Sequence, residues 1–145
     1  MDALMRTIVE GGPVMVPILG LSVLGLAIAI DRFWAFRRFF RAPAGTDANL
    51  SPQERLNRLQ RGFGLLSTII TAEPMLGILG TVTGIIDTFR SLRLPDAASP
   101  LAATAGIGEA LVTTAAGLVA ALILIFPYNA LLGLLARAAA RLERE

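Results

Sequence analysis

The segment 97–136, AASPLAATAGIGEALVTTAAGLVAALILIFPYNALLGLLA, contains a single charged side chain, Glu109. A helix needs about 20 apolar residues to cross the roughly 30 Å hydrocarbon core of a bilayer, so this run is long enough to span a membrane. A carboxylate near the middle of such a helix costs about 2.5 to 3.5 kcal/mol on insertion scales, and residues of this kind usually face a protein interior or an ion pathway. Glu109 is therefore the first candidate functional residue.

The composition predicts an all-α integral membrane protein, because hydrophobic residues make up 54% of the 145 residues. Cysteine and histidine are both absent, which excludes disulfides and thiolate chemistry and removes the commonest metal ligand. The sequence has no paired nucleophile and base, no metal-ligand cluster and no phosphate-binding loop. We therefore predict a protein that is not an enzyme and has no cofactor or metal, in which protons are handled by carboxylates and hydroxyls.

The apolar runs predict one domain, 1–145, with three transmembrane helices at about 13–34, 64–92 and 101–135. Before them, residues 1–10 alternate apolar and charged side chains at helical spacing. This pattern is typical of a short amphipathic helix lying at the membrane interface.

A helix start is predicted at Ser51, where Pro52 and Glu54 complete a capping box. We expect this helix to continue without a break into the second span. Pro74 lies inside that span and should kink it.

The basic residues are all arginines, and their positions predict the topology. Cytoplasmic flanks of membrane helices are enriched in basic residues, so both arginine-rich segments should be cytoplasmic and the N-terminus periplasmic. We interpret the arginines as a topology signal and not as a site for nucleic acid or lipid headgroups, because basic flanks are common in membrane proteins. Seven lie from the end of the first span to the start of the second, and three follow the last: Arg32, Arg37, Arg38, Arg41, Arg55, Arg58, Arg61, and Arg137, Arg141, Arg144.

Small residues in the second and third spans predict close helix packing. In lipid, helices associate through close backbone approach, and a Gly-x-x-x-Gly spacing is typical of such contacts. The hydroxyl of Thr81 lies among these glycines and could instead face a polar path. The packing candidates are Gly77, Gly80, Gly84 and Gly117.

Counting inward from the external ends of the spans places Thr81 and Glu109 at a similar depth of about 11 Å. On the third span, Glu109 and Thr113 are four residues apart and share a helix face. Glu73 falls roughly 22 Å deep, so we interpret it as a pore-mouth group near the cytoplasmic interface. We expect the chain to supply no second carboxylate at the depth of Glu109.

Two ordered motifs carry a family resemblance. They are EPMLGILGTVTGI at 73–85 and GIGEALVTTAAGL at 106–118, followed by Tyr128 and Asn129. Together they resemble the MotA/TolQ/ExbB proton channel family, and ExbB most closely. The resemblance covers the second and third spans closely and the first span loosely.

This resemblance implies a pentameric channel in the bacterial inner membrane. The pentamer would surround an ExbD/TolR-like single-span partner that supplies an aspartate. Proton motive force would then drive a TonB/TolA-like periplasmic effector and, through it, transport work. Such relatives usually carry a large helical cytoplasmic region between the first two spans, whereas this chain has a short segment there.

By similarity, Glu109 corresponds to the channel glutamate, and Thr81 and Thr114 correspond to pore threonines. Thr113 occupies a position where relatives often carry alanine, so its role rests on helical geometry alone. Desolvation disfavours the charged form of a carboxyl, so Glu109 would bind a proton from the periplasmic side and release it as the partner passes.

Three other classes of protein fit parts of the pattern. A non-conducting membrane scaffold would use the small-residue faces without needing Glu109. A holin-like pore former would share the short length and the charged tail, and a rotor-ring subunit would also use one buried carboxylate. Rotor-ring subunits are usually two-span hairpins, which the third span argues against.

Overall fold

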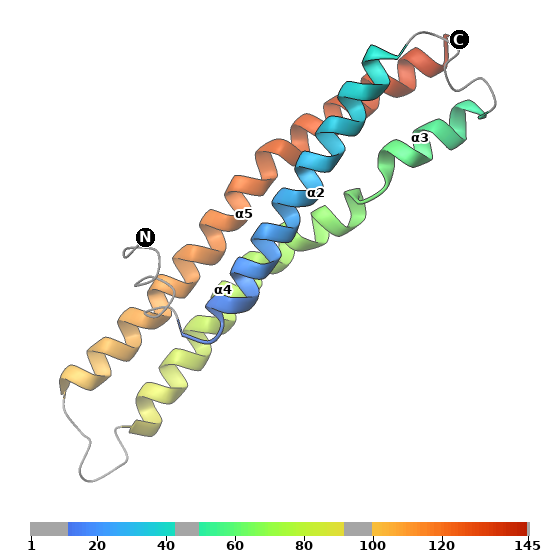
Figure 1. Ribbon diagram of the computed structural model, residues 1–145. Helices are drawn as coiled ribbons and strands as arrows, with labels where there is room; N and C mark the ends of the chain where they lie inside the picture. Colours follow the sequence, from blue (N-terminus) through green and yellow to red (C-terminus); the bar gives the residue numbers. More distant parts are fainter. Residues whose placement is uncertain (1–11, 43–49, 92–99, 145) are drawn as a thin grey trace.

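The computed structural model describes residues 12–42, 50–91 and 100–144, which form an elongated bundle of helices (Figure 1). The helices are α2 (Met15–Arg41), α3 (Pro52–Gln60), α4 (Phe63–Ser91) and α5 (Pro100–Leu142). The amphipathic helix expected at residues 1–10 lies outside the described residues.

Three segments are long and apolar enough to cross a membrane: Met15–Arg41, Pro52–Arg90 and Gly106–Leu142. The chain is therefore an all-helical, multi-pass membrane protein within its described residues, as the composition predicted. Two helices run past the expected span ends: α2 extends to Arg41, and α5 continues through Pro127 for 43 residues. At 1.5 Å per residue, α5 is about 64 Å long, roughly twice the thickness of the hydrocarbon core.

The capping box at the start of α3 is confirmed. The Glu54 amide donates to Ser51 Oγ at 3.2 Å, and the Ser51 amide donates to Glu54 Oε2 at 2.8 Å. The expected continuous helix is wrong, because the chain breaks between α3 and α4. Gly62 has a φ of +84° there, a left-handed conformation that glycine adopts without steric cost.

The helices α4 and α5 run side by side in opposite directions and form the most extensive contact of the molecule (Figure 1). The helix α2 packs on both of them through one face, because its buried residues recur at steps of three, four and seven. These residues are Met15, Ile18, Gly25, Ala29 and Phe36.

Large side chains fill the core at the arginine-rich end of the bundle. Phe36 and Phe63 meet edge to face with ring centroids 6.2 Å apart, and the Tyr128 ring lies 6.0 Å from that of Phe63. At the end of α5, Arg141 lies over the Phe39 ring. These contacts join α2, α4 and α5 at the arginine-rich end of the bundle.

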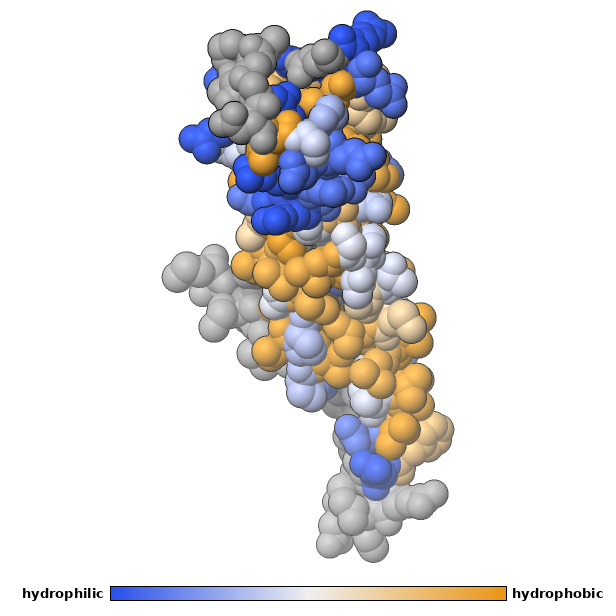
Figure 2. Space-filling view, turned by 90° about the vertical axis from the view of Figure 1, so that its right-hand side faces the viewer, coloured by the Kyte–Doolittle hydropathy of each residue, from blue (hydrophilic) through white to orange (hydrophobic). Residues whose placement is uncertain are grey.

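The exterior of the bundle is apolar along its middle. A hydrophobic belt covers the space-filling surface, and hydrophilic side chains bound it at both ends (Figure 2). Side chains such as Val23, Ile78, Leu122 and Phe126 are exposed by more than half of their surface. In water such a surface would be unfavourable, so lipid or other protein must cover it.

Candidate functional site

The helices α4 and α5 meet along a seam of small residues. A Cβ added at Gly77 would lie 3.1 Å from the Thr114 backbone, and one added at Gly84 would lie 2.8 Å from the Ala110 Cβ. Similarly, a Cβ on Gly117 would lie 2.5 Å from the Glu73 carbonyl oxygen. A Cβ added at Gly80 would overlap the Thr113 side chain. All four glycines singled out from the sequence therefore lie in this seam.

Two of the candidate threonines meet across the seam. The hydroxyls of Thr81 and Thr114 contact each other, and both share the Gly77 carbonyl as an acceptor. The bond from Thr114 to this carbonyl is 2.8 Å long and joins α5 to α4. The structure thus brings together the two threonines that the family resemblance had paired.

Thr113 lies beside this pair, but its side chain is 1% exposed and packs on Gly80. Its hydroxyl donates to the Glu109 carbonyl of its own helix at 3.0 Å. Thr113 thus fills the seam, and any role for it in a proton path stays a prediction.

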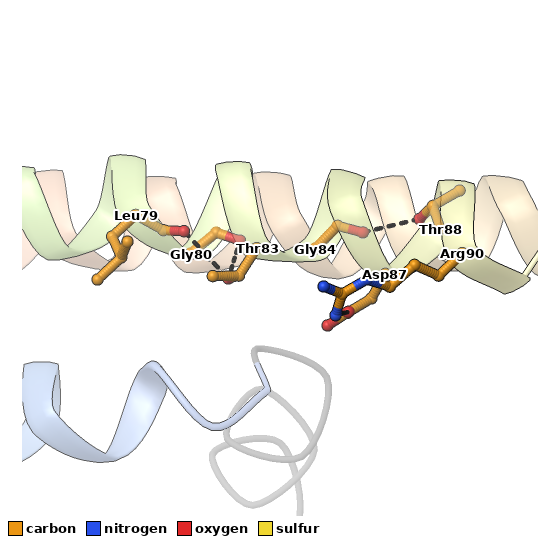
Figure 3. Close-up of polar contacts among 7 residues, drawn as sticks. All are labelled: Leu79, Gly80, Thr83, Gly84, Asp87, Thr88 and Arg90. Atoms are coloured by element: carbon orange, nitrogen blue, oxygen red, sulfur yellow. Dashed lines mark hydrogen bonds and ion pairs between the residues drawn. The ribbon is translucent and has the colours of Figure 1, made fainter.

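Further along α4, two more threonines bond to carbonyls of their own helix (Figure 3). Thr83 donates to the Leu79 and Gly80 carbonyls, both at 3.0 Å, and Thr88 donates to the Gly84 carbonyl at 2.9 Å. Internal bonds of this type satisfy a hydroxyl without a partner helix.

The Glu109 side chain lies on the outer surface of α5. Its carboxyl group is next to Gly12, just before the start of α2, where an added Cβ would lie 3.4 Å from the Glu109 Cδ. Gly12 has a φ of +64°, so glycine suits this position in both conformation and size. Within the described residues, no side chain or backbone group hydrogen-bonds to the Glu109 carboxylate.

The antiparallel register places Glu109 one turn further from the threonine pair than expected. Gly106 packs on Thr88 and Ala110 on Gly84, so Glu109 lies at the level of Ile85 instead of Thr81. The depth estimate failed because the two helices do not begin and end at the same level.

The expectation that no other carboxylate lies near this depth was also wrong. Asp87 lies two residues beyond Ile85, the α4 residue that is level with Glu109. This separation is about 3 Å along the helix axis. Its carboxylate is exposed and pairs with Arg90 at 3.4 Å (Figure 3). The i,i+3 spacing of these opposite charges was a sequence signal for this pair.

The Glu73 side chain is fully buried (0% exposed), whereas that of Glu109 is exposed. Oε1 lies 2.8 Å from Ser22 Oγ of α2, whereas Oε2 has no partner within the described residues. A carboxyl enclosed by its own chain does not line a pore mouth in this conformation. Its assignment as a pore-mouth group stays a prediction for an assembly in which these helices move apart.

The hydrogen bonds around Ser22 indicate which form of Glu73 fits. Ser22 Oγ lies 2.8 Å from both the Ile18 carbonyl and Glu73 Oε1, but its single hydrogen can serve one of them at a time. Both bonds form together when Glu73 carries a proton and donates to Ser22. Neither α2 between 15 and 30 nor α5 between 110 and 136 has a charged residue to balance a carboxylate.

The comparison with protein families matches residues 47–144 to the MotA/TolQ/ExbB proton channel family. The chain belongs to this family. The match includes all of α3, α4 and α5, and thus Glu73, Glu109 and the threonine pair.

Individual relatives agree with this assignment. A Synechocystis protein named as ExbB-like 1 is 32% identical over 90% of this chain and 71% of its own length. The Tol-Pal system protein TolQ of Pseudomonas aeruginosa is 38% identical over 50% of this chain and 31% of its own length. ExbB of Salmonella typhimurium is 41% identical over 48% of this chain and 28% of its own length.

The relatives contain residues that have no counterpart in this chain. The Synechocystis alignment extends over 182 positions, more than the 145 residues present here, so that relative has residues inserted within the matched region. The chain spans about a third or less of the length of the TolQ and ExbB relatives.

Proposed function

We propose that this chain is the proton-conducting subunit of an inner-membrane complex that uses proton motive force for periplasmic or outer-membrane work. Glu109 is the proton carrier in this proposal. The observation that carries it is the exposed Glu109 carboxyl, nine residues into a helix that has no other charged residue before Arg137. A carboxylate facing acyl chains is costly, so a protein surface must cover it in the membrane.

A homopentamer around a single-span partner provides this cover. Further copies of the chain would bury the apolar faces of α4 and α5, and the partner helix would bring an aspartate close to Glu109. Family membership supports this arrangement. The Thr81 and Thr114 hydroxyls, about one turn from the level of Glu109, would extend the polar path toward the arginine-rich end.

The direction of proton flow follows from the arginine distribution. Both arginine-rich segments belong on the cytoplasmic side by the positive-inside rule, so the N-terminus is periplasmic. Glu109 then lies in the periplasmic half of the membrane and would be loaded from that side. A TonB/TolA-like effector would receive the resulting motion.

Reconstituted proton flux tests this function. The chain is purified with its co-expressed single-span partner, placed in liposomes, and given an imposed potential while internal pH is followed with a dye. Glu109→Gln should lower the flux at least about a hundredfold, because the amide cannot take up and release the proton. The mass of the complex should stay unchanged.

Glu143→Gln is the matched control, because Glu143 is exposed at the C-terminal end. It should conduct as the unmodified protein does. If Glu109→Gln conducts at the unmodified rate, Glu109 is not the carrier. If the unmodified complex carries no flux at all, the scaffold alternative is favoured instead.

A further inference from the structure

A pocket of about 960 Å³ lies between the C-terminal half of α2 and the α3 segment, at the arginine-rich end. Arginines from both segments line it. The α2 side contributes Arg37, Arg38 and Arg41, and the α3 side contributes Arg55, Arg58 and Arg61.

The pocket is strongly positive. Arg32 also lines it and pairs with Asp31, which is the only carboxylate among the described lining residues. Seven arginines and one aspartate give the lining a formal charge of +6. Positive charges at this density attract anions, and the planar guanidinium group matches the geometry of phosphate oxygens.

Two features of the pocket are typical of the headgroup region of a bilayer. Trp34 belongs to its lining and is 71% exposed, and aromatic side chains of this kind are enriched at the membrane interface. A hydrophilic band directly adjoins the apolar belt at this end of the molecule (Figure 2). An anion bound here would therefore lie where phospholipids present their phosphates.

An apolar stripe on α2 leads to the pocket. Val23, Leu26, Ile30 and Phe33 are exposed and recur at steps of three and four, and the next step reaches Arg37. This stripe lies on a different side of α2 from the face buried against α4 and α5. It offers a surface for acyl chains directly below the arginines.

We propose that this pocket binds the phosphate headgroup of an anionic phospholipid, with the acyl chains along the exposed stripe of α2. This proposal replaces the interpretation of these arginines as a topology signal alone. The arginines by themselves do not distinguish the phosphate of a lipid from free phosphate. The stripe selects the lipid, because only a lipid covers both the charged pocket and the apolar surface.

Trp34 is the only tryptophan of the chain, so its fluorescence reports on the pocket. The protein in a nonionic detergent is titrated with short-chain phosphatidylglycerol, short-chain phosphatidylcholine or inorganic phosphate. Phosphatidylglycerol should give a saturable change with an apparent Kd at least about tenfold below that of phosphatidylcholine. Inorganic phosphate at the same concentrations should leave the emission unchanged.

The double variant Arg38→Gln with Arg58→Gln removes one arginine from each side of the pocket. It should weaken phosphatidylglycerol binding about tenfold or more. Arg137→Gln with Arg144→Gln is the matched control, because it removes the same charge from the same end without touching the pocket lining. This control should keep the affinity within about twofold.

Equal affinities for the two lipids would overturn the proposal, as would equal losses in the two double variants. Binding of inorganic phosphate as tight as that of phosphatidylglycerol would assign the pocket to free phosphate instead. If the pocket variant does not fold, native mass spectrometry of the unmodified protein decides the question. Retention of phosphatidylglycerol in preference to phosphatidylcholine is then the required result.

Discussion

The Glu109 carboxylate lies on the outside of the helix bundle, whereas the Glu73 carboxyl is closed within it. In the proposed function, another subunit or a partner helix would reach Glu109 at this surface and exchange its proton. Glu73 is hydrogen-bonded to Ser22 of its own chain, and its side chain is fully buried in this conformation. Two glutamates in apolar helices can thus serve different purposes, depending on which face of the helix presents them.

Exchanging each glutamate for glutamine tests this difference most directly. Glu109→Gln should lower proton flux at least about a hundredfold, as stated above, whereas Glu73→Gln should leave it within about twofold. The amide introduced by Glu73→Gln can donate to Ser22 in place of a protonated carboxyl. A loss of flux in Glu73→Gln as large as in Glu109→Gln would place Glu73 on the proton path.

Removal of the Glu73 side chain should instead affect stability. Glu73→Ala leaves a cavity between α2 and α4 and loses the contact with Ser22, so we expect a loss of about 2 kcal/mol. Thermal unfolding in detergent, followed by circular dichroism, measures this loss. Glu73→Gln is the control and should unfold close to the temperature of the unmodified protein. Equal unfolding temperatures for all three proteins would contradict the role of Glu73 in joining α2 to α4.

A smaller effect on stability is expected from a substitution in the seam between α4 and α5. Gly80→Val places two methyl groups against Thr113 and should destabilise the α4–α5 contact by about 1 to 2 kcal/mol. Gly108→Val is a suitable control, because nothing lies within 4 Å of a Cβ at that position. Unfolding of both variants at the same temperature would show that the seam tolerates the added volume.

The smallest effect should come from the threonine pair. Thr81→Val keeps the shape of the side chain but removes its hydrogen bonds to Thr114 and to Gly77, at a cost of about 0.5 to 1 kcal/mol. If these hydroxyls also extend the path from Glu109, proton flux should fall more than stability does. Unchanged flux would limit the pair to helix packing.

Much of the seam could be predicted from the sequence, because steps of three and four place Gly77, Gly80 and Gly84 on one side of α4. The cap at Ser51 was equally predictable, since all its atoms belong to neighbouring residues. Which flank of α5 carries Glu109 was not, because nearly every residue around it is apolar. Apolar periodicity cannot distinguish a face covered by lipid from one covered by protein.

The enclosure of Glu73 could not be found from local spacing either. It depends on Ser22, 51 residues earlier in the chain, and on how α2 packs across the other two helices. The break at Gly62 was also missed, since Leu56, Leu59, Phe63 and Leu66 keep helical spacing across it. A glycine beside Arg61 at the end of a capped, polar helix was the available signal for a C-terminal stop.

The length of α5 has a mechanical consequence. Glu109 and Arg141 are 32 residues apart on one helix, which is about 48 Å. If α5 moves as a rigid rod, a tilt of about 5° pivoting at Glu109 would carry Arg141 sideways by about 4 Å. Arg141 contacts Phe39 and the Ala42 carbonyl near the end of α2, so this helix could act as a lever between the two sides of the membrane.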